Sequence, residues 1–456
     1  MSKILKIWEK VKSTAMKIVA GRVDPDLSGK DEEHIKKKIS DCVFAKRGEI
    51  STRLKSAELA KIYEGLSKNG RQKFMKIMAR GFDIDIEKIK IIIQKLQEGN
   101  EGKQKTAEME LSKAITPPYV RLLRKFTTIP DGFKFLIDFR AELLEIKNSD
   151  PHLKKFDGDL KELLSSLFDI ALLDIKEITW QSPASLLEKL IEYEAVHEIH
   201  SWADLKNRLD SDRQCFAFFH NKMPDEPIIF VQVALVDEIT DSIRKLLDGQ
   251  VEKIKPEEAD TAVFYSISNA QKGLAGINFG NFLIKRVVNV LSDKFKELKH
   301  FVTLSPVPHF RKWLDSVLSE GDESILTPAE IKIIRAVAKN SNAAYGLLVL
   351  LSSDWTDDPG LARTLKPVLM RLCAHYLIYV KKDEKAFDPV ANFHLSNGAH
   401  IERLNWLGDI SEKAIRQSAG IMVNFHYKLP DIEKNYELYI SESQVNASKE
   451  VRKWLK

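Results

Sequence analysis

The chain has 456 residues, of which 44% are hydrophobic and 30% charged, and its formal net charge is +5. These values are typical of a soluble globular protein with two or three domains and an ample core. No apolar run is long enough to cross a membrane, and the three cysteines, Cys42, Cys215 and Cys373, match no disulfide framework or zinc pattern. We expect a reducing compartment, and the cytoplasm by default, because the N-terminus also lacks a secretory cleavage site.

Positive charge is concentrated in the first third of the chain. Residues 1–170 carry a net charge of about +9, which leaves about −4 for the remainder. A basic region can mark a nucleic-acid or membrane surface. Acidic and basic residues are interleaved here, as in residues 31–38, so a solvated helical surface is the favoured interpretation. We therefore expect no nucleic-acid and no membrane partner.

Residues 1–170 are predicted to form a helical domain. Apolar side chains recur there at steps of three and four residues, in the manner of amphipathic helices. Turn residues separate these stripes, and predicted breaks include residues 68–70 and Asp157-Gly-Asp159. An amphipathic face of this domain is the expected surface for self-association. The stripes cover residues 4–18, 54–63, 74–78 and 86–96.

The character of the chain changes near residue 170, where β-branched and aromatic runs begin. Residues 215–220 and 228–235 predict the two strands of a hairpin, joined by a turn at 221–227. Several helices are predicted after residue 310, and a late strand is predicted over 421–427. Mixed strands and helices behind a helical domain indicate an α + α/β class, with domains at 1–170 and 171–456.

Residues 261–310 contain the predicted active-site unit. A strand at 261–268 leads into the turn Gly273-Leu-Ala-Gly-Ile-Asn-Phe-Gly280 and a helix at 279–298. A glycine-rich turn that opens a helix offers N–H groups to a pyrophosphate. The turn matches neither common phosphate-binding fingerprint, and on pattern alone an ordinary strand-to-helix connection explains it equally well.

A short strand at 300–304 follows, and Ser305 stands at its end. Pro306 favours an extended backbone at Ser305, so the hydroxyl is placed for chemistry.

Histidines supply the other candidates for chemistry. His394 lies between a long helix and a predicted strand, and the near-neutral pKa of histidine suits proton transfer. Local sequence alone favours a satisfied core histidine, and spacing cannot pair His394 with Ser305. His197 and His200 are three positions apart, as in some metal sites, but no third ligand is visible nearby. We expect no metal.

Several stretches together resemble the malonyl-CoA decarboxylase family. They occur in the family's order and span roughly residues 175–440, which makes the resemblance far more specific than any single motif. The stretches are Ile178-Thr-Trp-Gln-Ser-Pro183, Asp260-Thr-Ala-Val-Phe-Tyr-Ser-Ile-Ser268, Gly273-Leu-Ala-Gly-Ile-Asn-Phe-Gly-Asn-Phe-Leu-Ile-Lys285, Leu304-Ser-Pro-Val-Pro308, Asn392-Phe-His-Leu-Ser-Asn-Gly-Ala399, Arg403-Leu-Asn-Trp406 and Met422-Val-Asn-Phe-His-Tyr427.

The resemblance implies a helical domain followed by a GNAT-like (acetyltransferase-fold) catalytic domain. It implies decarboxylation of malonyl-CoA to acetyl-CoA and CO2 without a metal or organic cofactor, by a protein that is often a homotetramer. The family's serine, histidine and active-site tyrosine fall on Ser305, His394 and Tyr427. Some relatives carry an acid where this chain has Asn278. The family's CoA-phosphate turn falls on Ala275, Gly276, Ile277, Asn278, Phe279, Gly280 and Asn281.

The expected mechanism passes through a thioester enolate. We expect His394 to donate a proton to the α-carbon and Tyr427 to orient the malonyl head, while Ser305 hydrogen-bonds either the departing carboxylate or the histidine. One alternative is a GNAT-type acyltransferase that passes an acyl group from CoA to an amine. Another is a non-catalytic acyl-CoA- or RNA-binding regulator, suggested by the basic first third.

Overall fold

The computed structural model describes residues 23–44, 49–98, 101–249, 253–277 and 283–456. The apolar stripe predicted at 4–18 and residues 278–281 of the predicted CoA-phosphate turn lie outside these ranges. The chain divides into two compact units, which are described separately. The first comprises Met1–Asp174, Phe219–Pro227 and Gln271–Phe279, and the second comprises Ile175–Phe218, Ile228–Ala270 and Gly280–Lys456.

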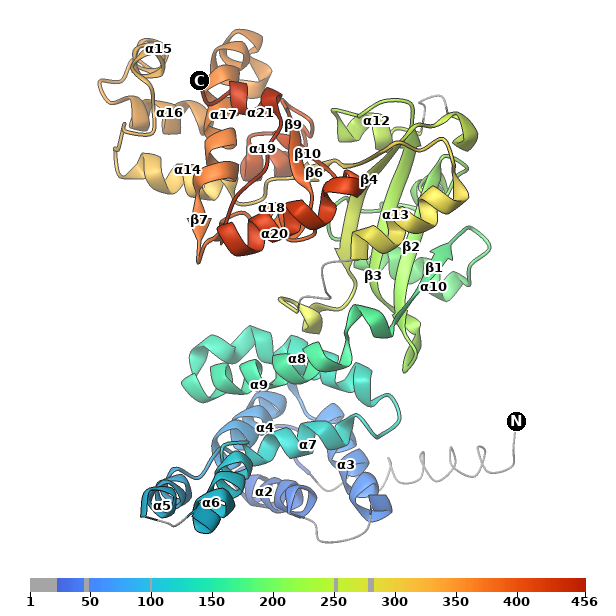
Figure 1. Ribbon diagram of the computed structural model, residues 1–456, viewed down its shortest axis with the longest axis vertical. Helices are drawn as coiled ribbons and strands as arrows, with labels where there is room; N and C mark the ends of the chain where they lie inside the picture. Colours follow the sequence, from blue (N-terminus) through green and yellow to red (C-terminus); the bar gives the residue numbers. More distant parts are fainter. Residues whose placement is uncertain (1–22, 45–48, 99–100, 250–252, 278–282) are drawn as a thin grey trace. The chain divides into compact units, whose positions relative to one another are not determined.

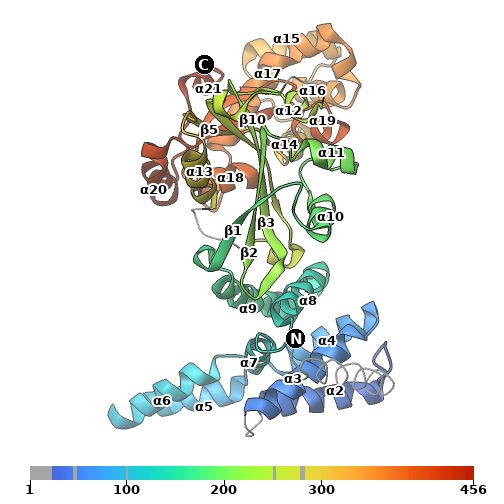
Figure 2. The same cartoon turned by 90° about the vertical axis from the view of Figure 1, so that its right-hand side faces the viewer.

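The first unit is built mainly from helices, as predicted (Figures 1 and 2). Aromatic side chains fill its centre, where the ring of Tyr63 lies 5.2 Å from Phe74 and 4.8 Å from Phe139. Burial of such rings is a main source of stability in a core of this kind. The helices are α2 (Gly29–Val43), α3 (Glu49–Glu64), α4 (Lys68–Gly81), α5 (Ile86–Glu98), α6 (Glu101–Ala114), α7 (Pro118–Phe126), α8 (Gly132–Ile146) and α9 (Pro151–Leu167).

Two predicted breaks in this unit are wrong. Residues 68–70 form the first turn of α4, because the Ser67 hydroxyl caps the helix by accepting from the Gly70 amide at 3.1 Å. Asp157-Gly-Asp159 lies inside α9. The Asp157 carboxylate accepts from Arg140 at 2.9 Å and from Lys147 at 2.8 Å, so its oxygens bind side chains instead of capping a turn.

The second unit contains a mixed sheet in the order β1-β2-β3-β4-β5-β10-β6, with β9 paired to β10. β4 and β5 run parallel, with Thr261 opposite His300, and helix α13 (Leu283–Lys294) connects them. The predicted α + α/β class, a helical part followed by a GNAT-like mixed-sheet domain, is confirmed. The strands are β1 (Leu173–Ile178), β2 (Arg213–His220), β3 (Met223–Val236), β4 (Thr261–Asn269), β5 (His300–Thr303), β6 (Ser305–Pro306), β9 (His400–Asn405) and β10 (Met422–His426); β7 (Lys381–Lys382) and β8 (Lys385–Ala386) form a separate pair.

The hairpin of β2 and β3 is confirmed, but its predicted turn is too long. β2 ends at His220 and β3 begins at Met223, so Pro224 and Pro227 lie within a strand. β4 pairs with β3 only from Ile229 onward. Before that point β3 lacks this neighbour, and proline is tolerated where no ladder partner needs its missing N–H.

The remaining described helices, α10 to α21, belong to the second unit. The helix predicted at 279–298 corresponds to α13, which spans Leu283–Lys294 and therefore ends before the predicted residue 298. His394 lies on the short helix α18 (Pro389–Leu395). Among the described helices, none combines the length and apolar character that a bilayer crossing needs. The others are α10 (Ala184–Tyr193), α11 (Trp202–Asn207), α12 (Ile243–Leu247), α14 (Phe310–Ser319), α15 (Pro328–Ala338), α16 (Ala343–Leu351), α17 (Pro359–Tyr379), α19 (Glu412–Ser418), α20 (Ile432–Glu442) and α21 (Lys449–Lys453).

Candidate active site

Ser305 lies where a strand of the sheet is interrupted. β5 ends at Thr303 and β6 begins at Ser305, and both strands pair with β10. On the other side of β10, the register with β9 shifts between Asn424 and Phe425. Irregular pairing of this kind re-aims side chains. Here it leaves the Ser305 hydroxyl donating to the Thr303 hydroxyl at 2.9 Å.

The three residues predicted to act in catalysis form one hydrogen-bonded chain. The Ser305 Oγ atom is 3.0 Å from Nε2 of His394, and Nδ1 of His394 is 2.8 Å from the Tyr427 hydroxyl. These side chains come from β6, from α18 and from the residue after β10. Each is no more than 5% exposed. The structure thus brings together a serine and a histidine that sequence spacing could not pair.

The tautomer of the histidine depends on where the Ser305 hydroxyl directs its hydrogen. A serine hydroxyl has one hydrogen, and that of Ser305 goes to Thr303. With the Ser305 hydrogen on Thr303, Nε2 of His394 carries a hydrogen and donates it to Ser305 Oγ. Nδ1 is then an acceptor, and the Tyr427 hydroxyl donates to it. In this arrangement the hydrogen bonds run from the phenol through the imidazole to the two hydroxyls.

The surroundings of His394 are apolar. Phe425 stacks on the imidazole with ring centroids 4.6 Å apart, and Phe264 lies edge-on to Tyr427 at 6.4 Å. Burial lowers the pKa of His394 to about 3, because the charged imidazolium loses its hydration. Burial also raises the pKa of Tyr427 well above its ordinary value. Both groups are neutral near pH 7.

Asp388 holds the helix that carries His394. Its Oδ1 accepts from the amides of Val390 and Ala391 at the start of α18, at 2.9 and 3.1 Å. Its Oδ2 accepts from the amide of His309, four residues after Ser305, at 3.2 Å. One buried carboxylate therefore joins α18 to the segment that follows the serine. The sequence carries one signal for this role of Asp388, since an aspartate before a proline is a recognisable helix start.

A second polar network fixes the strands beneath the site. Asn424 is fully buried, and its Nδ2 donates to the carbonyl oxygens of Thr303 and Thr240 at 2.7 and 3.1 Å. Its Oδ1 accepts from Arg403 at 3.2 Å and from Asn405 at 2.8 Å. All the amide atoms of Asn424 are thus engaged. The family resemblance includes these residues, but the sequence does not reveal which contacts they make.

The described part of the predicted CoA-phosphate turn belongs to the first unit. Arg140 donates to the carbonyls of Gly273 and Ala275 at 2.6 and 2.9 Å, which fixes the start of the turn. Gly276 has a φ of +72°, where a side chain is strained. A Cβ atom there would lie 3.6 Å from Nζ of Lys161. A flexible cation therefore stands beside the one glycine of the described turn whose backbone is left-handed.

The backbone amides of this turn are not equally available. The amide of Ala275 already donates to Lys272, and that of Ile277 donates to Leu274, each at 3.1 Å. Among the predicted CoA-binding residues that are described, these two amides are engaged within the turn. Residues Asn278, Phe279, Gly280 and Asn281 lie outside the described residues.

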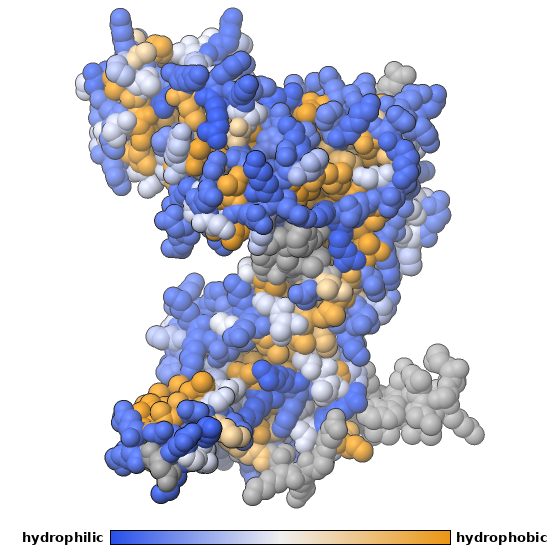
Figure 3. All heavy atoms as spheres, in the orientation of Figure 1, coloured by the Kyte–Doolittle hydropathy of each residue, from blue (hydrophilic) through white to orange (hydrophobic). Residues whose placement is uncertain are grey.

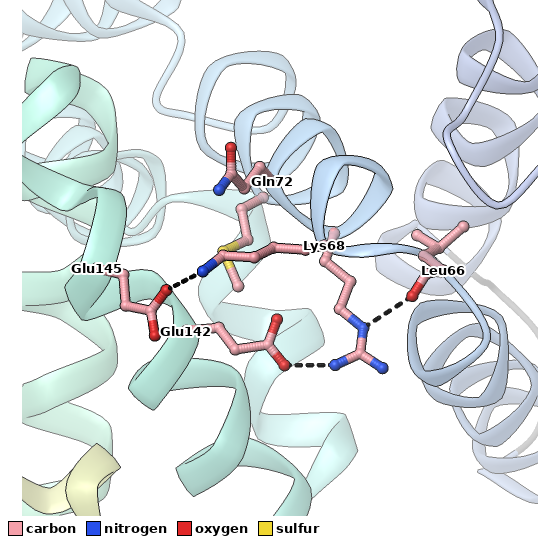
Figure 4. A pocket seen from close by; sticks show the side chains of 7 residues that line it. Leu66, Lys68, Gln72, Glu142 and Glu145 are labelled. Carbon is pink, nitrogen blue, oxygen red and sulfur yellow. Dashed lines mark hydrogen bonds and ion pairs between the residues drawn. The ribbon is translucent and has the colours of Figure 1, made fainter.

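Two other places among the described residues lie apart from the chain of Ser305, His394 and Tyr427. His197 and His200 lie in the loop between α10 and α11 and not on a helix. A cavity of about 370 Å³ opens in the first unit, where Lys68 pairs with Glu145 at 2.8 Å and Arg71 with Glu142 at 2.6 Å (Figure 4). These charges are already paired, and no predicted site residue lines the cavity.

A mixed sheet that holds a hydroxyl, an imidazole and a phenol in a dry hydrogen-bonded chain defines an enzyme suited to moving protons. Comparison with known proteins is more specific. The model of the malonyl-CoA decarboxylase C-terminal domain matches residues 171–456, and that of the N-terminal domain matches residues 82–168. The chain belongs to the malonyl-CoA decarboxylase family.

Individual relatives agree with this assignment. Mitochondrial malonyl-CoA decarboxylase of Anser anser anser is 37% identical over 415 residues, which are 87% of this chain and 82% of the relative. The enzyme of Mus musculus is 36% identical over 416 residues, 87% of this chain and 84% of the relative. The crystal structure of malonyl-CoA decarboxylase from Rhodopseudomonas palustris is 38% identical with a TM-score of 0.84, covering 92% of this chain and 99% of that one. The structure from Agrobacterium vitis has a TM-score of 0.83 at 38% identity, covering 93% and 100%.

Proposed function

We propose that the chain converts malonyl-CoA to acetyl-CoA and CO2, with Ser305, His394 and Tyr427 as its catalytic residues. The observation that carries this proposal is the 3.0 Å contact between Ser305 and His394 in a site with almost no solvent exposure. Loss of CO2 breaks the bond between the carboxylate and the α-carbon, and the electron pair moves into the thioester as an enolate. A dry site with fixed hydrogen-bond donors stabilises such developing charge, by roughly 3–4 kcal/mol for each good donor.

His394 protonates the α-carbon of the enolate. The free imidazole is neutral, since burial lowers its pKa to about 3. A bound malonyl carboxylate places a negative charge beside the ring, and such a charge favours the imidazolium. Decarboxylation followed by protonation consumes one proton, so the histidine takes one from solvent in each turnover. A positioned acid of this kind is worth about 100- to 10,000-fold in rate.

Ser305 and Tyr427 hold the imidazole from its two nitrogens. The Tyr427 hydroxyl donates to Nδ1, which keeps the hydrogen of the neutral ring on Nε2. The 3.0 Å contact favours the role of Ser305 in orienting the histidine over direct binding of the departing carboxylate. Tyr427 also orients the malonyl head.

The phosphates of CoA bind at the turn that contains Gly276. Lys161 beside this glycine supplies a positive charge, and the left-handed backbone leaves the approach free of a side chain. Gly276→Ala should raise KM about tenfold while kcat barely changes, because the strain acts on binding and not on the reacting end. Gly158→Ala, at a helical glycine with open space around it, is the matched control. Unchanged CoA affinity in Gly276→Ala would remove this assignment.

The decisive experiment measures products. Purified protein is incubated with malonyl-CoA alone, and CO2 and acetyl-CoA are quantified together. Equal amounts of both, with no amine acceptor present, are expected of a decarboxylase. An acyltransferase would need an acceptor and release free CoA. Absence of turnover combined with salt-sensitive RNA binding would instead favour a non-catalytic RNA-binding regulator.

The helical domain at 1–170 associates with further copies of the chain, as a homo-oligomer and by resemblance a tetramer. Apolar side chains gather on the visible surface over α5 and α6 (Figure 3), where Ile86, Ile91 and Met109 are more than half exposed. A monomer rarely exposes such a patch unless it binds something. Ile91→Lys should lower the mass measured by light scattering; an unchanged mass would exclude this patch from the interface.

The cytoplasm remains our proposed location, and cell fractionation tests it.

A further inference from the structure

Three histidines and a glutamate form a second cluster that the reaction does not use. They are His300, His400, Glu402 and His426. No motif in the sequence connects them, since they are spread over 126 positions of the chain. The strand pairing of the second unit brings them to one place.

The register of three neighbouring strands explains the cluster. His426 on β10 lies directly opposite His400 on β9, and Glu402 follows His400 by two positions on the same side of β9. On the other edge of β10, His426 lies opposite Val302 of β5, so His300 points to the same side as His426. Side chains from β5, β9 and β10 therefore converge on one face of the sheet.

The donor atoms are close enough to share one ion. Oε2 of Glu402 lies 2.6 Å from Nε2 of His400 and 3.2 Å from Nδ1 of His426. One atom from each of these three residues lies within 4.8 Å of the others. The ring of His300 is centred 5.7 Å from that of His426. A single carboxylate oxygen thus lies between two imidazole nitrogens.

We infer that His400, Glu402 and His426 bind a divalent transition-metal ion of the Zn²⁺ or Co²⁺ class. Imidazole nitrogens with one carboxylate are the donors these ions prefer, whereas Mg²⁺ and Ca²⁺ require mostly oxygen. The Glu402 side chain is 27% exposed, which gives an ion a route in. Lys428, whose Nζ is 3.9 Å from Glu402, competes with the ion for the same oxygen.

The expected role of this ion is structural. It would join β5, β9 and β10 on the face opposite to His394, because Phe425 and Tyr427 contact His394 while His426 between them points away. An ion that binds only the folded chain raises its stability. The inference stands independently of the proposed reaction.

Metal binding to the tag-free, full-length protein tests the inference. Protein treated with a chelator is titrated with Co²⁺, followed by its visible absorption, and with Zn²⁺ by calorimetry. We expect one ion per chain, a Co²⁺ spectrum of low coordination number, no competition by Mg²⁺, and a higher melting temperature with Zn²⁺. Failure to bind one ion, or a melting temperature that Zn²⁺ leaves unchanged, would overturn the site, and neither measurement needs a variant.

Variants then assign the ligands. Loss of a residue that only supports a metal ligand weakens metal binding about 10- to 100-fold. Glu402 is proposed as a direct ligand, so Glu402→Gln should weaken binding by at least about 100-fold. Lys428→Met should tighten binding several-fold by removing the competing cation. His152→Gln is the matched control, an exposed histidine paired with Asp83 at 3.5 Å. Equal affinity in Glu402→Gln and wild type, with both folded by circular dichroism, would overturn the assignment.

Discussion

Two histidines lie on opposite sides of the C-terminal end of β10, and their environments differ. His394 belongs to α18 and His426 is the last residue of β10. His394 packs on Phe425 and is held by neutral hydroxyl groups. His426, next in sequence to Phe425, faces the Glu402 carboxylate and two further imidazoles. The strand is shared, so the difference comes entirely from what packs against each face.

This comparison shows what decides the chemistry of a buried imidazole. In a dry pocket without a carboxylate the ring stays neutral, and its two nitrogens have fixed and different roles. Beside a carboxylate, a positive charge at the ring is stabilised, whether the ring gains a proton or binds a metal ion. The first environment suits a proton that is taken up and given away in each turnover, and the second suits a stable structural link.

Replacing each histidine in turn gives the largest expected contrast. His394→Asn should lower kcat by about 100- to 10,000-fold, with little change in KM, because it removes the proton donor and not a binding contact. His426→Asn should leave kcat within about threefold of wild type if its face is structural. Steady-state decarboxylation assays measure both. Near-normal turnover in His394→Asn would remove the proton-donor role.

The pH profile sharpens the comparison further. Since the pKa of free His394 is about 3, the proposed mechanism requires the neutral enzyme to gain a proton before the transition state. We expect kcat/KM to fall by about tenfold for each unit of rising pH between about pH 5 and 8. That is about a thousandfold over the range. A flat profile would mean that the neutral imidazole donates its own Nε2 hydrogen.

The hydrogen-bonded group proposed to be catalytic could largely be found from the sequence. The family resemblance points to Ser305, His394 and Tyr427, and in the structure these residues are in contact. Their partners were missed. Thr303 and Asn424 look like ordinary strand residues, and their roles depend on an interrupted strand and a shifted register that local patterns do not encode.

The opposite face could not be predicted at all. His400, Glu402 and His426 come together through strand register, which is set by long-range pairing. The same limit explains the two wrong helix breaks. Asp157-Gly-Asp159 has the composition of a turn, but ion pairs of Asp157 with Arg140 and Lys147 hold it within a helix. Tertiary contacts override local propensity at such positions.

Removing the tyrosine hydroxyl should have an intermediate effect. Tyr427→Phe leaves Nδ1 of His394 buried without its 2.8 Å donor, which costs about 1–3 kcal/mol. We expect kcat to fall by about tenfold or somewhat more, with KM nearly unchanged. The ¹⁵N chemical shifts of the imidazole should also report a loss of the single tautomer. An unaltered tautomer would show that Ser305 alone orients the ring.

The smallest expected effect comes from Thr303, which receives the hydrogen of Ser305. Thr303→Val keeps the shape but removes the acceptor, so Ser305 can turn its hydrogen toward Nε2 of His394 and compete with the tautomer that Tyr427 favours. We expect kcat to fall by about three- to tenfold, since the change removes the acceptor of two buried hydrogen bonds, one from Ser305 and one from the Phe425 amide. Thr303→Ser keeps the hydroxyl and should restore the rate, which separates the hydrogen bond from packing. If Thr303→Val and Thr303→Ser have the same kcat, the direction of the hydrogen bonds does not determine the tautomer of His394.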